Sequence, residues 1–476
     1  MMDGLKPYPT YKDSGLPWLG PMPSSWKVAR NGALFVQRNE VGFGDLPILE
    51  VSLKTGVRVR DLDGNGRKQV MADREKYKRA RKGDLAYNMM RMWQGAVGIV
   101  PVDGLVSPAY VVARAVQQID PKYFAYLFRT DACMREFDTF SRGIVKDRNR
   151  LYWEDFKQIP SPLPPQDEQS AIVRFLDHVE GRIRGCYIAA KRRLISLLNE
   201  QKMAMIHSAV TRGFDPGVRL KPSGVTWLED VPEHWDVAAL RMRYSVQLGK
   251  MLDAGRITGN HLLPYLRNTD VQWDHINGVD LPVMDIREDE YARYTVKPGD
   301  LLVCEGGEVG RAGFWDGALP ICGYQKALHR VRPIDPSRDL PRFLYYLLYS
   351  VSKRGVFLAD GSENTIAHLT AEKFKRYRFA FPPRKEQDAI ARHLDITLAG
   401  VDQGIELETH SIEVLHEYRT RLVADVVTGK LDVRAAAARL PDETEEPDDP
   451  AEVDSVFNGE QPEDADVEMA AEEAGA

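Results

Sequence analysis

Two long stretches of the chain carry apolar residues at the spacing of an amphipathic helix. In the later stretch these residues are interrupted only by Glu408 and Arg419, and they are Ile390, Leu394, Leu398, Val401, Ile405, Ile412, Leu415, Leu422 and Val426. In the earlier stretch they are Ile172, Phe175, Val179, Ile183, Cys186, Ala190, Leu194 and Leu197. A pattern sustained over about forty residues predicts helices about 60 Å long, beyond the ordinary globular range. We expect the two helices to pair as an antiparallel coiled coil, each stopped by the glycine that follows it, Gly213 or Gly429.

A different pattern precedes each helical stretch. Short β-branched and apolar runs alternate with Gly, Pro and Asp, which is typical of strands joined by tight turns. The runs are Leu46–Val59, Gly83–Tyr87, Ala96–Val102, Leu301–Cys304, Ala312–Trp315 and Ala327–Val331. Gly307, Gly310 and Gly313 lack the strand–helix setting of a nucleotide-binding loop, so we expect a strand–turn–strand there. The fold class predicted is α/β: two globules alternating with two long helices.

The two globules share a repeated sequence. Their opening residues match at an offset of 209: Ser14-Gly15, Trp18-Leu19, Pro23, Trp26 and Val28 return as Ser223-Gly224, Trp227-Leu228, Pro232, Trp235 and Val237. The offset then drifts, because Gly83-Asp84-Leu85 recurs 216 residues later as Gly299-Asp300-Leu301. Ordered matches exclude chance, and the period is too long for a solenoid. Since both copies keep these tryptophans, we expect them to anchor the scaffold.

The start of each helical stretch repeats too, at an offset of 218. The matching residues are Phe156-Lys157, Pro164-Pro165, Glu168-Gln169, Ala171-Ile172, Arg174 and Leu176-Asp177, against Phe374-Lys375, Pro382-Pro383, Glu386-Gln387, Ala389-Ile390, Arg392 and Leu394-Asp395. Val210-Thr211 and Val427-Thr428 close the copies, whose centres, roughly 40–150 and 250–370, hardly match. The domains predicted are a first globule (1–165), a central helix (166–213), a second globule (214–383), a distal helix (384–432) and an acidic disordered tail (433–476). A pseudo-twofold internal repeat with divergent centres is expected if the halves recognise different things.

Composition narrows the class of protein. No stretch is apolar enough to span a membrane, and the N-terminus lacks the apolar core of a signal peptide, so we expect a cytoplasmic protein without a membrane partner. Four cysteines at irregular spacings predict neither a metal site nor a disulfide framework. The net charge of −6 is uneven: residues 441–476 hold 15 acids and no Lys or Arg, which leaves residues 1–440 with 64 basic against 55 acidic side chains, a net of +9. A basic body with an acidic tail suits a polyanion binder.

Three kinds of motif together resemble the specificity subunits of type I restriction–modification enzymes. They are the motifs that open each globule, the Lys-Pro-Gly-Asp-Leu-Leu-Val strand at 297–303 and the Pro-Pro-x-x-Glu-Gln-x-Ala-Ile sequence that starts each long helix. The resemblance covers residues 14–432 in order and in duplicate. It implies two target-recognition domains, each reading one half of a bipartite duplex DNA sequence. It also implies that the paired helices set the spacing and hold two adenine-methylating modification subunits, which restriction subunits then join.

No catalytic centre is expected in this chain. It contains neither the Asn-Pro-Pro-Tyr/Phe motif of an adenine methyltransferase nor a phosphate-binding Gly-x4-Gly-Lys-Ser/Thr loop. The resemblance therefore places S-adenosylmethionine, ATP and magnesium on partner subunits. Asp155 is followed by Lys157 as in some nuclease motifs, but Lys373 replaces it in the second copy, so a solvated charge pair is expected. Two alternatives remain open: a self-contained restriction or methyl-transfer enzyme, and a coiled-coil adaptor without DNA binding.

The DNA-contacting residues are expected in polar loops of the divergent centres. Cations bind phosphates, while Arg, Lys, Asn, Gln, Ser and Thr also reach base edges. In the first globule the candidates are Arg91, Gln94, Arg142, Lys146, Arg148, Asn149 and Arg150. In the second globule they are Arg267, Asn268, Thr269, Lys326, Ser362, Asn364 and Thr365.

Overall fold

The computed structural model describes residues 5–60, 74–116, 119–143, 149–252, 259–359 and 368–441. The chain divides into two compact units, and each unit takes one globule together with parts of both long helices. Unit 1 comprises Met1–Arg193 and Thr409–Ala476, and unit 2 comprises Leu194–Glu408. The boundary therefore crosses each helical stretch near its middle, unlike the division into globules and helices expected from sequence.

Unit 1 is built on a four-stranded antiparallel sheet in the order β4-β11-β8-β9. Its strands are β4 (Phe35–Arg38), β8 (Leu85–Asn88), β9 (Val97–Ile99) and β11 (Tyr110–Ala115). Four strand pairs surround it: β1 (Tyr11–Asp13) with β2 (Pro21–Pro23), β3 (Lys27–Arg30) with β12 (Pro160–Leu163), β5 (Leu49–Ser52) with β6 (Gly56–Val59), and β7 (Lys78–Ala80) with β10 (Gly104–Val106). Its short helices are α1 (Asn31–Leu34), α2 (Pro121–Phe128), α3 (Asp131–Phe140) and α4 (Trp153–Phe156).

Unit 2 repeats this plan. Its four-stranded sheet has the order β16-β24-β21-β22, made of β16 (Tyr244–Leu248), β21 (Leu301–Cys304), β22 (Ala312–Phe314) and β24 (Leu328–Pro333). The pairs β13 (Leu220–Lys221) with β14 (Val231–Pro232) and β15 (Asp236–Ala239) with β25 (Arg378–Phe381) correspond to β1·β2 and β3·β12. Its helices are α7 (Tyr291–Tyr294), α8 (Pro341–Lys353), α9 (Val356–Ala359) and α10 (Ala371–Arg376). Distinct to unit 2 are the sheet β20 (Val283–Asp285), β17 (Leu262–Leu266), β23 (Gly323–Tyr324) and the pair β18 (Val271–Gln272), β19 (His275–Ile276).

The repeated Gly-Asp-Leu makes the same turn in both sheets. Gly83 and Gly299 have φ of 86° and 85°, a region that favours glycine. The aspartate that follows accepts a hydrogen bond from a backbone N–H three residues earlier, at 2.9 Å for Asp84 and 2.7 Å for Asp300. Each carboxylate also pairs with an arginine of its sheet, Arg38 or Arg332. The turn thus fixes where β8 and β21 begin, and the prediction that 301–313 is a strand–turn–strand is confirmed by β21 and β22.

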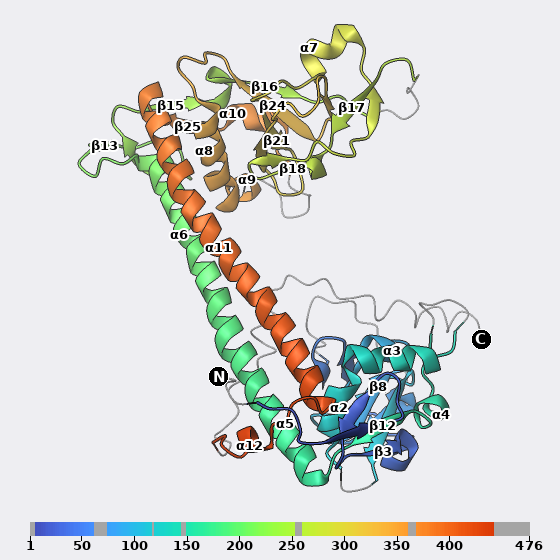
Figure 1. Ribbon diagram of the computed structural model, residues 1–476. Coiled ribbons are helices and arrows are strands. Elements are labelled where there is room, and N and C mark those ends of the chain that lie inside the picture. The colour runs from blue at the N-terminus through green and yellow to red at the C-terminus, as the bar shows by residue number, and fades with distance from the viewer. Residues whose placement is uncertain are drawn as a thin grey trace. The chain divides into compact units, whose positions relative to one another are not determined.

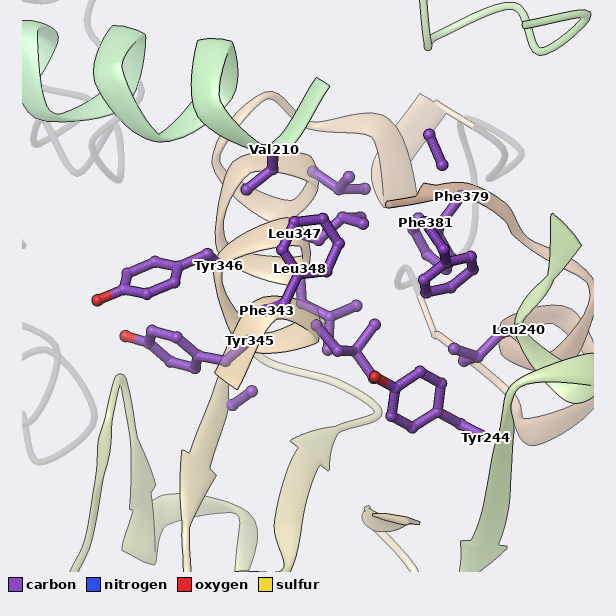
Figure 2. Close-up of a cluster of buried hydrophobic side chains, with 14 of the residues drawn as sticks. Val210, Leu240, Tyr244, Phe343, Tyr345, Tyr346, Leu347, Leu348, Phe379 and Phe381 are labelled. Atoms are coloured by element: carbon purple, nitrogen blue, oxygen red, sulfur yellow. The ribbon is translucent and has the colours of Figure 1, made fainter. Parts of the chain in front are cut away.

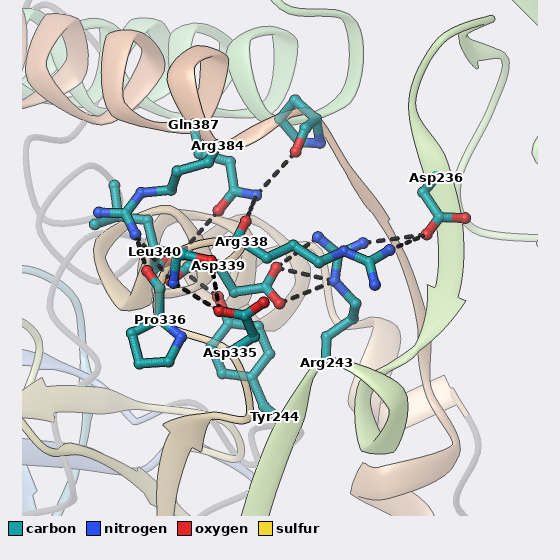
Figure 3. A network of polar contacts seen from close by, with 12 residues as sticks. Asp236, Arg243, Tyr244, Asp335, Pro336, Arg338, Asp339, Leu340, Arg384 and Gln387 are labelled. Atoms are coloured by element: carbon teal, nitrogen blue, oxygen red, sulfur yellow. Dashed lines mark hydrogen bonds and ion pairs between the residues drawn. The ribbon is translucent and has the colours of Figure 1, made fainter.

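The Glu-Gln pair at the start of each long helix ties that helix to its own globule. Glu168 accepts a hydrogen bond from the buried Trp26 indole at 2.7 Å, and Glu386 accepts one from Trp235 at 3.1 Å. The side-chain oxygen of Gln387 accepts from the Leu340 N–H at 2.8 Å, and its amide donates to carbonyls in 338 and 382 (Figure 3). Gln169 makes the equivalent contacts in unit 1, with Asp120 and Pro164. The repeated residues therefore hold the scaffold, and the prediction that the tryptophans anchor it is confirmed for the buried Trp26 and Trp235.

Each unit has a core of aromatic and aliphatic side chains next to the contacts of its Glu-Gln pair. In unit 2, side chains of α8 such as Phe343, Leu347 and Leu348 pack against Phe379 and Phe381 of β25 (Figure 2). The helix ends join the same core, at Val210 from the earlier helix and at Ile390, Leu394 and Leu398 from the later one. In unit 1 the corresponding core takes Ile172 and Leu176 from the earlier helix and Leu422 and Val426 from the later one. Each globule is thus packed against both helical stretches.

The later stretch is one α-helix, α11 (Arg384–Val427), whereas the earlier one is α5 (Gln166–Gly181), a π-helical segment (Arg182–Ile188) and α6 (Ala189–Arg212). Within unit 2, the part of α6 from residue 194 and the part of α11 up to residue 408 run side by side (Figure 1). In unit 2, Lys202 pairs with Asp402 at 2.5 Å, and Ile206 and Leu398 share a core. In unit 1, Glu180 pairs with Arg419 at 2.6 Å. The contacts within each unit follow an antiparallel order, and Arg419, which interrupts the apolar pattern, is satisfied by an ion pair.

The apolar face predicted for the earlier stretch is wrong beyond Ile183. Cys186, Leu194 and Leu197 are exposed, whereas Ile188 is buried. In a π-helix residues five apart share a face, so the buried positions step from Ile183 to Ile188. The repeat gives the reason for the extra residue: Asp177 precedes Val210 by 33 residues, but the equivalent Asp395 precedes Val427 by 32. We attribute the π segment to this one-residue insertion, which the helix absorbs as a wide turn.

Both helical stretches end as expected, at glycines with φ of 70° (Gly213) and 77° (Gly429). The disordered tail predicted from residue 433, however, begins too early. α12 (Arg434–Ala437) packs on α5, and Val433 and Ala437 are buried in the core of unit 1. These two apolar side chains are enough to pack the short segment against unit 1. The acidic composition of residues 433–476 as a whole gave no sign of this packing. Residues 442–476 lie outside the described residues.

Candidate nucleic-acid interface

Four loops of unit 2 meet at one end of the four-stranded sheet. Glu305, the residue after β21, donates its N–H to the Ala327 carbonyl at 2.9 Å and accepts the Leu369 N–H at 2.7 Å. The Asn268 amide donates to the Gly306 carbonyl at 3.0 Å. Gln325, at the start of the loop before β24, donates its N–H to the Leu266 carbonyl at 3.0 Å. Segments 266–270, 305–308, 325–327 and 368–369 therefore form one surface, here called the unit 2 loop cluster.

Unit 1 has the same arrangement at the same end of its sheet. Met89, the residue after β8, donates its N–H to the Ala109 carbonyl at 3.3 Å and accepts the Leu151 N–H at 2.9 Å. Arg142 and Arg150 form a two-residue bridge at the neck of the loop that ends at Leu151. Segments 88–94, 107–110, 142–143 and 149–151 are the unit 1 loop cluster. Met89 and Glu305 are thus equivalent positions, held by the same two backbone hydrogen bonds.

Five predicted site residues of the first globule lie in the described part of the unit 1 loop cluster, and several are held by partners within the chain. Arg91 donates to Gln94 at 3.0 Å, and both are half-buried. Arg142 pairs with Asp155 but keeps 76% of its side chain exposed. The Asn149 amide donates to Asp138 at 3.0 Å, and the backbone of Arg150 pairs with that of Arg142. Lys146 and Arg148 lie outside the described residues.

Four predicted site residues of the second globule lie in the unit 2 loop cluster. Arg267 forms a two-pronged ion pair with the buried Asp270, at 2.8 and 2.9 Å. Asn268 is held against Gly306, while Thr269 and Lys326 are exposed. Ser362, Asn364 and Thr365 lie outside the described residues, in the segment that leads into His368. The structure therefore brings together candidates that are more than fifty residues apart in the sequence.

One expectation about charge is wrong. Asp155 does not form a solvated pair with Lys157, because Lys157 pairs with Glu154 while Asp155 is buried and faces Arg142. The Asp155 carboxylate faces Arg142 at the neck of the unit 1 loop and holds that side chain in place. Sequence reasoning missed this role because Arg142 and Asp155 are separated by the loop that they close.

The acidic residues of the unit 2 loop cluster differ in their surroundings. Glu308 accepts hydrogen bonds from Trp273 at 2.8 Å and from Lys353 at 2.5 Å, and these partners help to lower the pKa of its carboxyl although burial opposes them. Glu305 has no such partner among the described residues, and its partial burial raises the pKa of its carboxyl, against the nearby charges of His368 and Lys326. The backbone contacts that hold Glu305 in this place, with Ala327 and Leu369, are revealed only by the structure.

Two further features are absent from the described residues. No helix in that part of the chain is long and apolar enough to cross a membrane. No group of three or more His, Cys, Asp or Glu side chains gathers there in a way that could hold a metal ion.

Comparison with known proteins gives consistent matches. Residues 246–417 match the family described as type I restriction modification DNA specificity domain. The type I restriction enzyme MjaVIII specificity subunit of Methanocaldococcus jannaschii is 21% identical over 73% of this chain and 80% of its own length. The putative MjaX specificity subunit of the same organism is 22% identical over 67% of this chain and 69% of its own length. A solved chain from a study of complex assembly and conformational transition of the type I R-M system covers 85% of this chain and 98% of its own, with a TM-score of 0.61 and 18% identity.

Proposed function

The chain is related to the specificity subunits of type I restriction enzymes, and we propose that it is the DNA-recognition subunit of such an enzyme. In this role it recognises a bipartite duplex sequence, one half-site with each loop cluster. It directs the adenine methylation and the restriction that partner subunits carry out.

The observation that carries this proposal is a duplicated scaffold with different loops in the same place. The turn before β8 and β21, the tryptophan–glutamate bonds and the Gln169 and Gln387 contacts are kept in both units. The loop clusters occupy the same end of each sheet but share almost no residues, as Met89 and Glu305 illustrate. A protein that reads two different half-sites needs this combination of a constant frame and variable contacts.

We further propose that the long helices form a coiled coil that sets the half-site spacing and holds two modification subunits. Large apolar side chains remain exposed on them, including Leu197 on α6 and Ile396 and Leu407 on α11, which are 49%, 76% and 60% exposed. Apolar helix faces of this kind suit packing against helices of a partner. S-adenosylmethionine, ATP and magnesium would act on the partner subunits, and restriction subunits would join the assembled core.

Methylation by the reconstituted complex tests the proposal. The full chain with its modification subunits should methylate a library of duplexes only at one bipartite adenine motif. Exchanging residues 40–150 for the equivalent region of a relative should change one half of that motif and leave the other half and the spacing alone. If both halves changed together, the two units would not read independently. Methyl transfer by the purified chain alone would favour the self-contained enzyme instead.

A further inference from the structure

Glu305 stands out in the unit 2 loop cluster as an acidic side chain on a surface proposed to face DNA. Its backbone is fixed on both sides, by Ala327 and by Leu369. Its carboxylate is half-buried, and no hydrogen bond or ion pair joins it to another residue in the described ranges. Partial burial costs this carboxylate hydration, and although the charges of His368 and Lys326 lie nearby, no hydrogen-bond donor within the described ranges replaces the lost water. A carboxylate here also repels phosphates. Its presence is best explained by a donor that arrives with the ligand.

The neighbouring Asn268 side chain also has an acceptor without a donor. The Asn268 side chain donates its amide hydrogen to Gly306, and this bond fixes which end of the amide is the oxygen. That oxygen is buried and has no hydrogen-bond donor among the residues that the structure describes. The junction around Gly306 and Gly307 therefore contains two acceptors, the Glu305 carboxylate and the Asn268 oxygen, that lack donors. Of the two, only Glu305 is exposed enough to meet a ligand.

Duplex DNA offers such donors in the major groove as the amino groups of cytosine N4 and adenine N6. Resting on the function proposed above, we propose that Glu305 is a specificity-determining residue that accepts a hydrogen bond from one exocyclic base amino group in the second half-site. The equivalent position of unit 1 holds Met89, which has the same backbone bonds but an apolar side chain. The Met89 side chain is partly buried against the unit 1 core, and its accessible part would contact an apolar edge, such as the methyl group of thymine. Positions 89 and 305 are thus one reading position with two chemistries.

The test uses the full chain reconstituted with its modification subunits and a duplex library, with adenine methylation as the readout. Glu305→Ala should relax the second half-site at one base pair and leave every other position unchanged. Glu305→Gln keeps an acceptor, so it should retain part of the preference. Glu288→Gln, an exposed acid outside the loop cluster, is the matched control and should leave the motif intact. In unit 1, Met89→Glu should change one position of the first half-site only.

A duplex whose base at the relaxed position lacks its amino group provides the direct check. The wild-type chain should bind it about 10- to 100-fold more weakly than the normal duplex, the range for a good base contact. Glu305→Ala should bind both duplexes equally. An unchanged motif in the Glu305 variants, or a uniform loss of affinity at every position, would overturn the proposal, the latter by showing a structural role. If the wild-type complex had no motif at all, the proposed function itself would fail.

Discussion

Deletion of Gly185 tests the origin of the π segment between α5 and α6. One residue of an α-helix contributes 100° of rotation and a rise of 1.5 Å. The π segment at 182–188 holds one residue more than the equivalent part of α11. Removing Gly185 should therefore turn the segment into a regular α-helix in which Ile183 and Ile188 become four residues apart and keep the same face. At both ends of the earlier helical stretch, the apolar side chains would then still face the cores in which they are buried.

The matched control is deletion of Gly404, a glycine near the middle of α11. α11 has no π segment that could absorb the change, so one end of the helix must rotate by about 100° relative to the other. Rotation would take Leu422 and Val426 out of the unit 1 core, where they are 4% and 0% exposed. Each large buried aliphatic side chain contributes about 1.5–3 kcal/mol, so the loss should reach roughly 3–6 kcal/mol.

Thermal and urea unfolding of the two deletion variants compares these outcomes directly. The Gly185 deletion should leave the free energy of unfolding within about 1 kcal/mol of the original, because it also removes a glycine from a helix interior. The methylated motif should survive in the reconstituted complex. Equal destabilisation by the two deletions would refute the explanation of the π segment as an absorbed insertion.

Three further predictions concern the tail, the core and the repeat. Removing residues 442–476 should leave the methylated motif unchanged, whereas a cut before Val433 should lower the melting temperature, because Val433 and Ala437 are buried. Burial lowers the pKa of His329, so the unfolded chain takes up a proton at a higher pH than the folded chain does. The free energy of unfolding should therefore fall as the pH drops below about 6.5. Urea unfolding at pH 7.5 and 5.5 should show a smaller fall in that free energy for His329→Asn than for the original chain. Gln387→Ala should cost about 1–3 kcal/mol in urea unfolding, since it leaves the Leu340 N–H and the Pro382 carbonyl without partners, whereas substitution of the exposed Gln403 should cost little.

The sequence predicted the parts of the fold that rest on local pattern or on repetition. The strands β5, β6, β9, β21 and β22 fall within the apolar runs expected to form them, while β8 and β24 extend one and two residues beyond theirs. The helices end at Gly213 and Gly429, as expected. The exposed side of α6 could not be predicted, because a heptad count assumes α-helical geometry and the π segment shifts the phase by one residue. The ordered structure of residues 433–441 was also missed, because the prediction used an average over many residues. Two buried side chains decide it, and the average composition of the tail does not register them.

The candidate site shows a different limit. Polar loops in the divergent centres were recognisable as DNA-contacting candidates, and the structure gathers those within the described residues into one cluster in each unit. Which loop residues are available to a ligand, however, depends on pairing across the fold. Arg142 is tied to Asp155, which lies beyond its own loop, whereas Arg267 is tied to Asp270, three residues farther along the same turn. Cations held in this way are positioned in advance and lose less conformational freedom on meeting a phosphate.

Ligand-reading positions in a duplicated protein can be located by combining two criteria that neither sequence nor structure supplies alone. The first is equivalence of the backbone, as at Met89 and Glu305, which make the same two hydrogen bonds in their units. The second is chemical divergence of the side chain at that equivalent point. Positions that are equivalent and identical, such as Gln169 and Gln387, serve the scaffold because their partners lie within the chain. Positions that are equivalent but chemically unlike do not share an internal partner: Met89 packs in part against its own core, whereas Glu305 makes no side-chain hydrogen bond within the described residues. The accessible part of each side chain is then left to contact a ligand. By this reasoning the residue after the second strand of each sheet is where a change of half-site is most directly made.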